Sequence, residues 1–223
     1  MNYKVISTGS KGNALHIEEG SLSILVDCGV PFLSVCDIKP DLILLTHEHG
    51  DHLNMRTLKR ILQNHPTTKV LTPPHLLNRL FEAGIPVRQI YMCMRDDTLK
   101  FKKIAVEAKF STLPLFHDVE NVGWRIDLTK GVNKVSVMYA TDTARMDHIR
   151  LPGLDYYFIE ANYEDDEIEQ RIAEKEAAGE YIYEFRARAN HLSLAQADAW
   201  LAENAAIDSK IIYLHQHGGC CDE

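Results

Sequence analysis

Short apolar runs separated by polar turns recur along the chain and predict a protein rich in β-strands. The runs at 14–17 and 22–26 are joined by Glu18-Glu19-Gly20-Ser21, a spacing typical of a hairpin. The run at 42–45 contains only Leu and Ile, which predicts a buried strand. Further strands are expected at 3–7, 70–72, 87–92, 99–115 (two or three), 122–128, 135–140, 156–159 and 211–214.

Four segments carry helical signals. Apolar residues recur at helical spacing in 53–64, Gly84 closes a second helix over 75–83, and 165–178 is a highly charged helix. Ser193 is an N-cap residue for a helix to about 203. This order of elements fits two sheets covered by helices, although periodicity alone gives only α/β or α+β. Without a repeat or linker, residues 1–223 predict a single domain.

Composition places the chain among ordinary globular proteins. It has 45% hydrophobic and 25% charged residues, and no apolar run reaches the roughly 18 residues of a membrane helix. The N-terminus shows no signal peptide, and five cysteines at irregular spacings do not form a disulfide framework. We therefore expect a cytoplasmic protein without membrane partners.

The net charge of −8 argues against a broad basic face for nucleic acid. It does not exclude a nuclease, because two bound divalent ions add about +4 at the site itself.

Four metal-capable side chains follow the strand at 42–45: His47, His49, Asp51 and His52. The first two lie two residues apart and point to one side of an extended chain. We expect Gly50 to permit a sharp bend, and the last two to lie in the first turn of the following helix. Ligands that leave one turn at different angles suit two neighbouring metal ions better than one.

Three later residues follow apolar strands in the same way: His117, Asp142 and His215. Each alone is typical of a structural residue, and His217 is an alternative to His215.

The motif H-x-H-x-D-H over 47–52 resembles the signature of the metallo-β-lactamase superfamily. Ordered segments from Ser7 to Ser193 resemble its YycJ/WalJ group of small exonucleases, which is associated with 5′-to-3′ cleavage of DNA. These segments are S-T-G-S-K-G-N, L-V-D-C-G, L-L-T-H-E-H-G-D-H, F-H-D-V-E-N-V-G-W-R-I, A-T-D-T, I-E-A-N and N-H-L-S. The resemblance implies an α+β fold, a four-layer αββα sandwich.

The resemblance also implies two divalent metal ions, Zn²⁺ or Mn²⁺, held by nitrogen and carboxylate ligands. The first site would take His47, His49 and His117, the second Asp51, His52 and His215, and Asp142 would bridge the two ions. A metal-bound hydroxide would then be the nucleophile.

Catalytic and substrate-binding residues are expected around these ligands. Asp51 also orients the attacking water, and a Glu–His pair like that of related nucleases makes His191 the general acid and Glu160 its orienting partner. The simpler alternative is that His191 merely precedes a helix. Candidate phosphate contacts are Ser10, Asn13, Arg186 and Arg188, of which the first two equally fit a plain turn and the arginines a solvated surface.

These residues predict a dinuclear-metal phosphodiester hydrolase, with a DNA exonuclease favoured and nucleic acid as partner. The alternatives are a ribonuclease, a cyclic-nucleotide phosphodiesterase, a thioester or lactone hydrolase, and a metal-binding protein that performs no hydrolysis.

Overall fold

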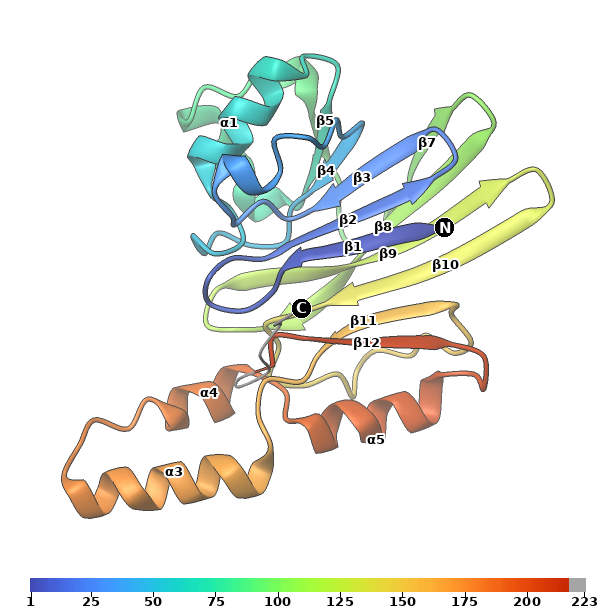
Figure 1. Cartoon of the computed structure of the whole chain (residues 1–223). Coiled ribbons are helices and arrows are strands. Elements are labelled where there is room, and N and C mark those ends of the chain that lie inside the picture. The colour runs from blue at the N-terminus through green and yellow to red at the C-terminus, as the bar shows by residue number, and fades with distance from the viewer. Residues whose placement is uncertain (217–223) are drawn as a thin grey trace. The chain divides into compact units, whose positions relative to one another are not determined.

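The computed structural model describes residues 1–216 (Figure 1). It consists of two compact units, which we describe separately. The first comprises Met1–Pro114 and Val122–Ser136, and the second comprises Leu115–Asn121 and the chain from Val137 onward. That 1–223 form a single domain stays a prediction. Among residues 1–216, no helix is long and apolar enough to cross a membrane.

Six strands form the first sheet in the order β1-β2-β3-β4-β5-β6. The neighbours β1, β2 and β3 are antiparallel, whereas β3 to β6 run parallel. The strands are β1 (Asn2–Ser7), β2 (Ala14–Glu19), β3 (Leu22–Val26), β4 (Leu42–Leu44), β5 (Lys69–Thr72) and β6 (Ile90–Met92). The predicted hairpin and the buried strand after it are confirmed, and all three residues of β4 are buried.

Helix α1 (Met55–Asn64) packs its Leu58, Ile61 and Leu62 into the core of this sheet. It begins later than predicted, because the side chain of Asn54 caps it by accepting from Arg56 N and Thr57 N. The expectation that Asp51 and His52 open the helix is therefore wrong, and both residues lie in the preceding turn.

The segment around α2 (Leu77–Glu82) also differs from prediction. A 3₁₀ turn, η2 (Pro74–Leu76), precedes this helix, and a second one, η3 (Val87–Gln89), occupies the first half of the strand predicted at 87–92. The carbonyl of Pro86 accepts from Gln89 N at 2.8 Å, which closes a turn before the strand begins. Local hydrogen bonding thus overrides the apolar pattern there.

The second sheet has the strand order β12-β11-β10-β9-β8-β7. Its members are β7 (Leu99–Lys103), β8 (Val106–Phe116), β9 (Glu120–Lys130), β10 (Asn133–Ala140), β11 (Tyr156–Glu160) and β12 (Lys210–Leu214). Strands β7 and β8 are antiparallel, and β10, β11 and β12 are parallel. Two mixed sheets with helices confirm the predicted α+β class.

Within the first unit, polar contacts join the two sheets. The indole N–H of Trp124 in β9 donates to the Leu45 carbonyl at 3.0 Å, and Lys103 in β7 pairs with Asp41 at 2.6 Å. Trp124 has no exposed surface. The end of β4, where the metal-capable residues begin, is therefore anchored from the opposite sheet.

Helices α3 (Asp165–Ala178), α4 (Glu184–Asn190) and α5 (Leu194–Asn204) belong to the second unit (Figure 1). The bounds of α3 and the Ser193 cap of α5 are as predicted, and Gln196 completes a capping box. Trp200 of α5 packs its ring edge against Tyr157 of β11. The sequence did not predict α4, since its seven residues are too few for a periodic signal.

Candidate metal centre

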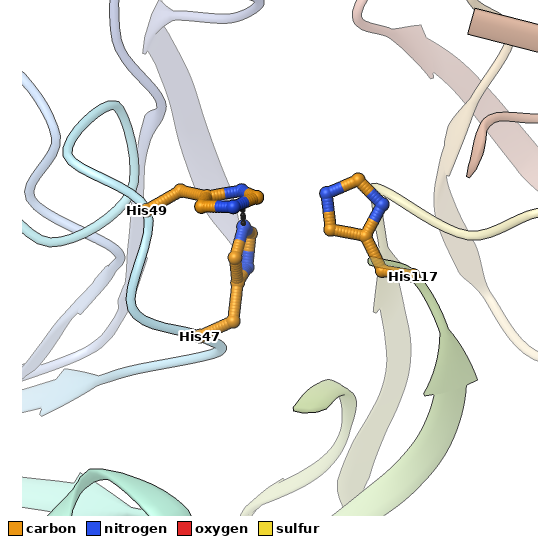
Figure 2. A group of neighbouring side chains, drawn as sticks. All are labelled: His47, His49 and His117. Atoms are coloured by element: carbon orange, nitrogen blue, oxygen red, sulfur yellow. Dashed lines mark hydrogen bonds between the residues drawn. The ribbon is translucent and has the colours of Figure 1, made fainter. Parts of the chain in front are cut away.

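In the first unit, the loop after β4 gathers three imidazoles. Nε2 of His47 lies 3.2 Å from Nδ1 of His49, as Figure 2 shows, and the rings of His47 and His52 are 4.2 Å apart. His47 and His52 are fully buried. The predicted clustering of these three histidines is thus present in the described loop.

Asp27, the residue after β3, orients His52. One carboxylate oxygen lies 2.7 Å from Nδ1 of His52, and Thr46 donates to Asp27 through both its backbone N–H and its hydroxyl. Burial raises the pKa of Asp27, and the charge and hydrogen bond of His52 oppose that rise. A carboxylate on Nδ1 fixes the orientation of the ring, as it does for histidines in many metal sites.

Asn13 ties the glycine-rich turn to the same place. Its side-chain oxygen accepts from Gly9 N at 2.8 Å, and its amide nitrogen lies 2.7 Å from Nε2 of His52. The residue is 1% exposed. The structure therefore gives Asn13 an internal role, whereas the phosphate contact predicted for it stays a prediction. Ser10 is exposed, and its predicted phosphate contact is likewise untested.

A close backbone contact positions the turn of Asp51 and His52. A Cβ atom on Gly29 would lie 1.7 Å from the carbonyl oxygen of Asp51 and 2.6 Å from the amide nitrogen of His52. Only glycine allows this approach. Gly50 was expected to provide the bend. Its φ angle is not positive, and a Cβ atom on it would meet no atom within 4 Å.

Gly29→Ala is therefore expected to destabilise the protein by about 2 kcal/mol or more, because backbone atoms of the turn must move. Gly50→Ala, in the same loop, is the matched control and should change stability by less than about 0.5 kcal/mol. Chemical denaturation of both variants measures the difference. Equal stability of the two would contradict the close contact.

In the second unit, four residues form a compact cluster of possible ligands: Asp142, Glu160, His191 and His215. One ligand atom from each lies within 4.8 Å of the others. Glu160 Oε1 is 2.6 Å from Nδ1 of His191 and 3.1 Å from Nδ1 of His215. The buried Glu160 thus holds both imidazoles at once, which is the pairing with His191 that the sequence predicted.

The carboxylates favour protonated imidazoles in this cluster. Burial lowers the pKa of His215, but hydrogen bonds to Asp142 and Glu160 outweigh it and raise the pKa to about 10. The pKa of His191 is likewise raised, since Glu160 outweighs the cost of its burial. The carboxylates of Asp142 and Glu160 therefore favour positive charge in this cluster.

Three site residues have positive φ angles within two residues of the end of a strand. These are Asp27 after β3, Asp142 after β10 and His215 after β12, with φ angles of 57°, 57° and 61°. Non-glycine residues rarely adopt this conformation, and it is frequent at functional sites. The left-handed turn ends each strand and redirects the side chain that follows it.

His117 lies beside the cluster of the second unit. Its Nδ1 is 3.2 Å from the carbonyl of Asn190, and its ring is 5.3 Å from that of His191. Burial lowers its pKa, which favours the neutral imidazole that a metal requires. Figure 2 draws its side chain after the end of β8.

The remaining predicted residues lie outside these clusters. Asp51 contributes its carbonyl to Asn13 N, and its carboxylate joins no group of three or more ligand atoms in residues 1–216. Arg186 is exposed and pairs with Asp118, and Arg188 is exposed near the end of α4. His217 lies outside the described residues.

Sequence analysis included Asp27 within the segment L-V-D-C-G and gave it no role, and it missed Thr46. The segment L-V-D-C-G held the signal for the first, because an acidic residue at a strand end can reach a neighbouring strand end. Thr46 precedes the histidines but gives no signal of its own.

The donor set fits divalent metal ions. It consists of imidazole nitrogens and carboxylate oxygens, the ligands of Zn²⁺ and Mn²⁺ in proteins. Nδ1 of His52 and Nδ1 of His117 each lie within hydrogen-bond distance of an oxygen acceptor, as is typical of metal-ligating histidine, and Nε2 of His117 also lies 3.2 Å from Asp118. Three free cysteines, Cys28, Cys36 and Cys93, lie in the described part and belong to neither cluster.

The fold and these His and Asp clusters define the class as a hydrolase of the metallo-β-lactamase fold with groups suited to divalent metal ions. The chain belongs to the beta-lactamase superfamily, because the model of the "Beta-lactamase superfamily domain" matches residues 23–215.

A shorter match links the chain to a nuclease. Over 61 residues, the chain is 36% identical to the exodeoxyribonuclease WalJ of Streptococcus pneumoniae. This match spans 23% of each protein. The chain thus matches about a quarter of the length of that relative.

Two solved structures share the fold. The metallo-beta-lactamase fold protein YhfI from Bacillus subtilis superposes with a TM-score of 0.67 at 19% identity, over 97% of this chain and 87% of that one. The short form of human tRNase Z gives a TM-score of 0.66 at 14% identity, over 97% and 92%. Both identities are low, so these likenesses support the fold alone.

Proposed function

We propose that this protein is a dinuclear-metal phosphodiester hydrolase, and that its substrate is DNA cleaved from the 5′ end. The observation that carries the proposal is the pair of clusters at strand ends, imidazoles in one unit and carboxylates with imidazoles in the other. The segment shared with an exodeoxyribonuclease favours DNA over other esters.

The proposed ligands are those that the superfamily motif assigns. One ion would be held by His47, His49 and His117, the other by Asp51, His52 and His215, and Asp142 would bridge them. Divalent ions bound there lower the pKa of water and neutralise the charge of a phosphodiester. Two such ions would be Zn²⁺ or Mn²⁺.

The protein's own groups supply orientation and a proton. Asp51 orients the attacking water, and the Nε2 proton of His191 goes to the leaving alkoxide oxygen. Glu160 holds the imidazole through Nδ1 at 2.6 Å and raises its pKa, which favours the protonated form that a general acid requires. The proposed contacts to phosphate remain Ser10, Asn13, Arg186 and Arg188.

The test compares esters on one preparation after chelation and reloading with Zn²⁺ or Mn²⁺. We expect hydrolysis of bis-p-nitrophenyl phosphate and of 5′-phosphorylated duplex DNA, with nucleotides released from the 5′ end, and weaker hydrolysis of RNA of the same sequence. Chelated protein should be inactive, and measured metal content should approach two ions per chain. Hydrolysis of a lactone or thioester without any phosphodiester cleavage would overturn the proposal.

A further inference from the structure

An exposed stack of planar side chains adjoins the cluster in the second unit. The guanidinium of Arg145 lies 4.3 Å above the ring of Phe116, and the His148 ring meets the same phenyl ring edge-on at 4.7 Å. Phe116 is 42% exposed, and the Arg145 side chain is 59% exposed. The guanidinium is therefore held over an aromatic ring while much of the Arg145 side chain faces solvent.

Hydrogen bonds fix this stack to the residues of the proposed site. Phe116 N donates to the Thr143 hydroxyl at 3.1 Å, and Ala144 N donates to the Phe116 carbonyl at 2.7 Å. Thr143 N donates to Glu160 at 3.0 Å. Arg145 thus lies three residues after Asp142, and Phe116 lies one residue before His117. Thr143 connects the stack to Glu160, the acid that orients His191.

A cavity of about 560 Å³ continues from Arg145 along α5. Its lining includes Arg145, Arg150, Leu192, Gln196, Trp200 and Glu203. Leu192 follows His191 directly, so the cavity reaches the chain segment of the proposed general acid.

The charges on this surface do not favour a particular ligand. Arg145 lies 3.7 Å from Asp147, and Arg150 lies 3.4 Å from Glu203, so each cation is matched by an acid. The surface therefore offers a planar, weakly hydrated guanidinium supported by an aromatic ring. Nucleobases stack on such surfaces whatever their sequence.

We propose that Arg145, supported by Phe116, forms a stacking platform for a nucleobase next to the scissile phosphodiester. The inference rests on the proposed function and adds to it a base-recognising position. The expected occupant is a base of a single-stranded end, because a base inside a duplex has both faces covered. A frayed terminus is the form in which a nuclease acting from an end meets its substrate.

The test measures binding rather than turnover. Fluorescence anisotropy, with the full chain in EDTA to prevent cleavage, compares a short single-stranded DNA oligonucleotide with an abasic oligonucleotide of equal length. The wild type should bind the base-containing strand about fivefold to a hundredfold more tightly, the range for stacking of one base. Arg145→Ala should remove most of that preference.

Two further variants separate stacking from charge and from general damage. Arg145→Lys keeps the charge but lacks the planar group, so it should also lose the preference. Arg125→Ala removes a half-buried arginine that pairs with Asp127 in β9, and this variant should keep the preference. A wild-type-like preference in Arg145→Lys or Arg145→Ala would overturn the platform.

Hydrolysis of bis-p-nitrophenyl phosphate by the metal-loaded wild type distinguishes a failure of the stacking platform from a failure of the proposed function. If that diester is hydrolysed while the two oligonucleotides bind equally, the platform is wrong and the proposed function stands. If the wild type neither hydrolyses the diester nor binds DNA, both are wrong.

Discussion

Asp142→Ala is expected to abolish hydrolysis and to remove at least one metal ion per chain. Asp142 is the proposed bridging ligand, it is 3% exposed, and its carboxylate lies 3.2 Å from Nδ1 of His215. Alanine offers no oxygen to a metal ion. Metal analysis after gel filtration and a bis-p-nitrophenyl phosphate assay measure the two losses.

The control for this variant is Asp142→Asn. Asp142 has a φ of 57°, a conformation that asparagine accepts and alanine disfavours. The asparagine variant should therefore fold like the wild type, yet bind metal weakly because an amide oxygen carries no charge. Full activity in Asp142→Asn would show that the carboxylate is no bridging ligand, and its unfolding transition would reveal any loss due to folding alone.

His191→Ala is expected to keep both metal ions and to slow turnover by roughly 10²–10⁴-fold, the usual contribution of a general acid. The structure sets His191 apart from His215 in two respects. Its Nδ1 lies closer to Glu160, at 2.6 Å, and its side chain is 18% exposed, so its other nitrogen can meet a substrate. Steady-state kinetics and metal content should be measured on the same samples.

The choice of substrate sharpens the result for His191. The p-nitrophenolate leaving group needs no proton, whereas a nucleoside alkoxide does, so the loss should be much larger on DNA than on the activated ester. Loss of a metal ion in this variant would instead make His191 a ligand, as its place in the four-residue cluster allows. An equal loss on both substrates would count against the proton-donor role.

The sequence predicted the elements with the clearest local signals. Strand β4 and helix α3 carry a continuous apolar run and a charged helical pattern, and both were found where expected. Errors arose where a short-range hydrogen bond competed with the pattern. Asn54 moved the start of α1, and the turn closed by Pro86 shortened β6.

Candidate site residues could be read from the sequence because strand ends mark them. An apolar run that stops at a histidine or aspartate is visible in one dimension, as with Asp142 and His215. The residues that these side chains contact could not be predicted in this way, because each of them lies on a distant segment of the chain. Asp27 meets His52 and Glu160 meets His215 across 25 and 55 residues, and no periodicity connects such pairs.

The amino-acid sequence by itself determined the strands and most of the helices, the motif over 47–52 and the superfamily to which the chain belongs. Only the tertiary structure decided that Asp27 orients His52, that Gly29 must lack a side chain beneath Asp51, and that Arg145 lies on Phe116. The physical reason is that backbone preference and burial are local properties of a segment. Contacts between segments depend on strand register and on how each loop turns, and both are settled only when the core packs.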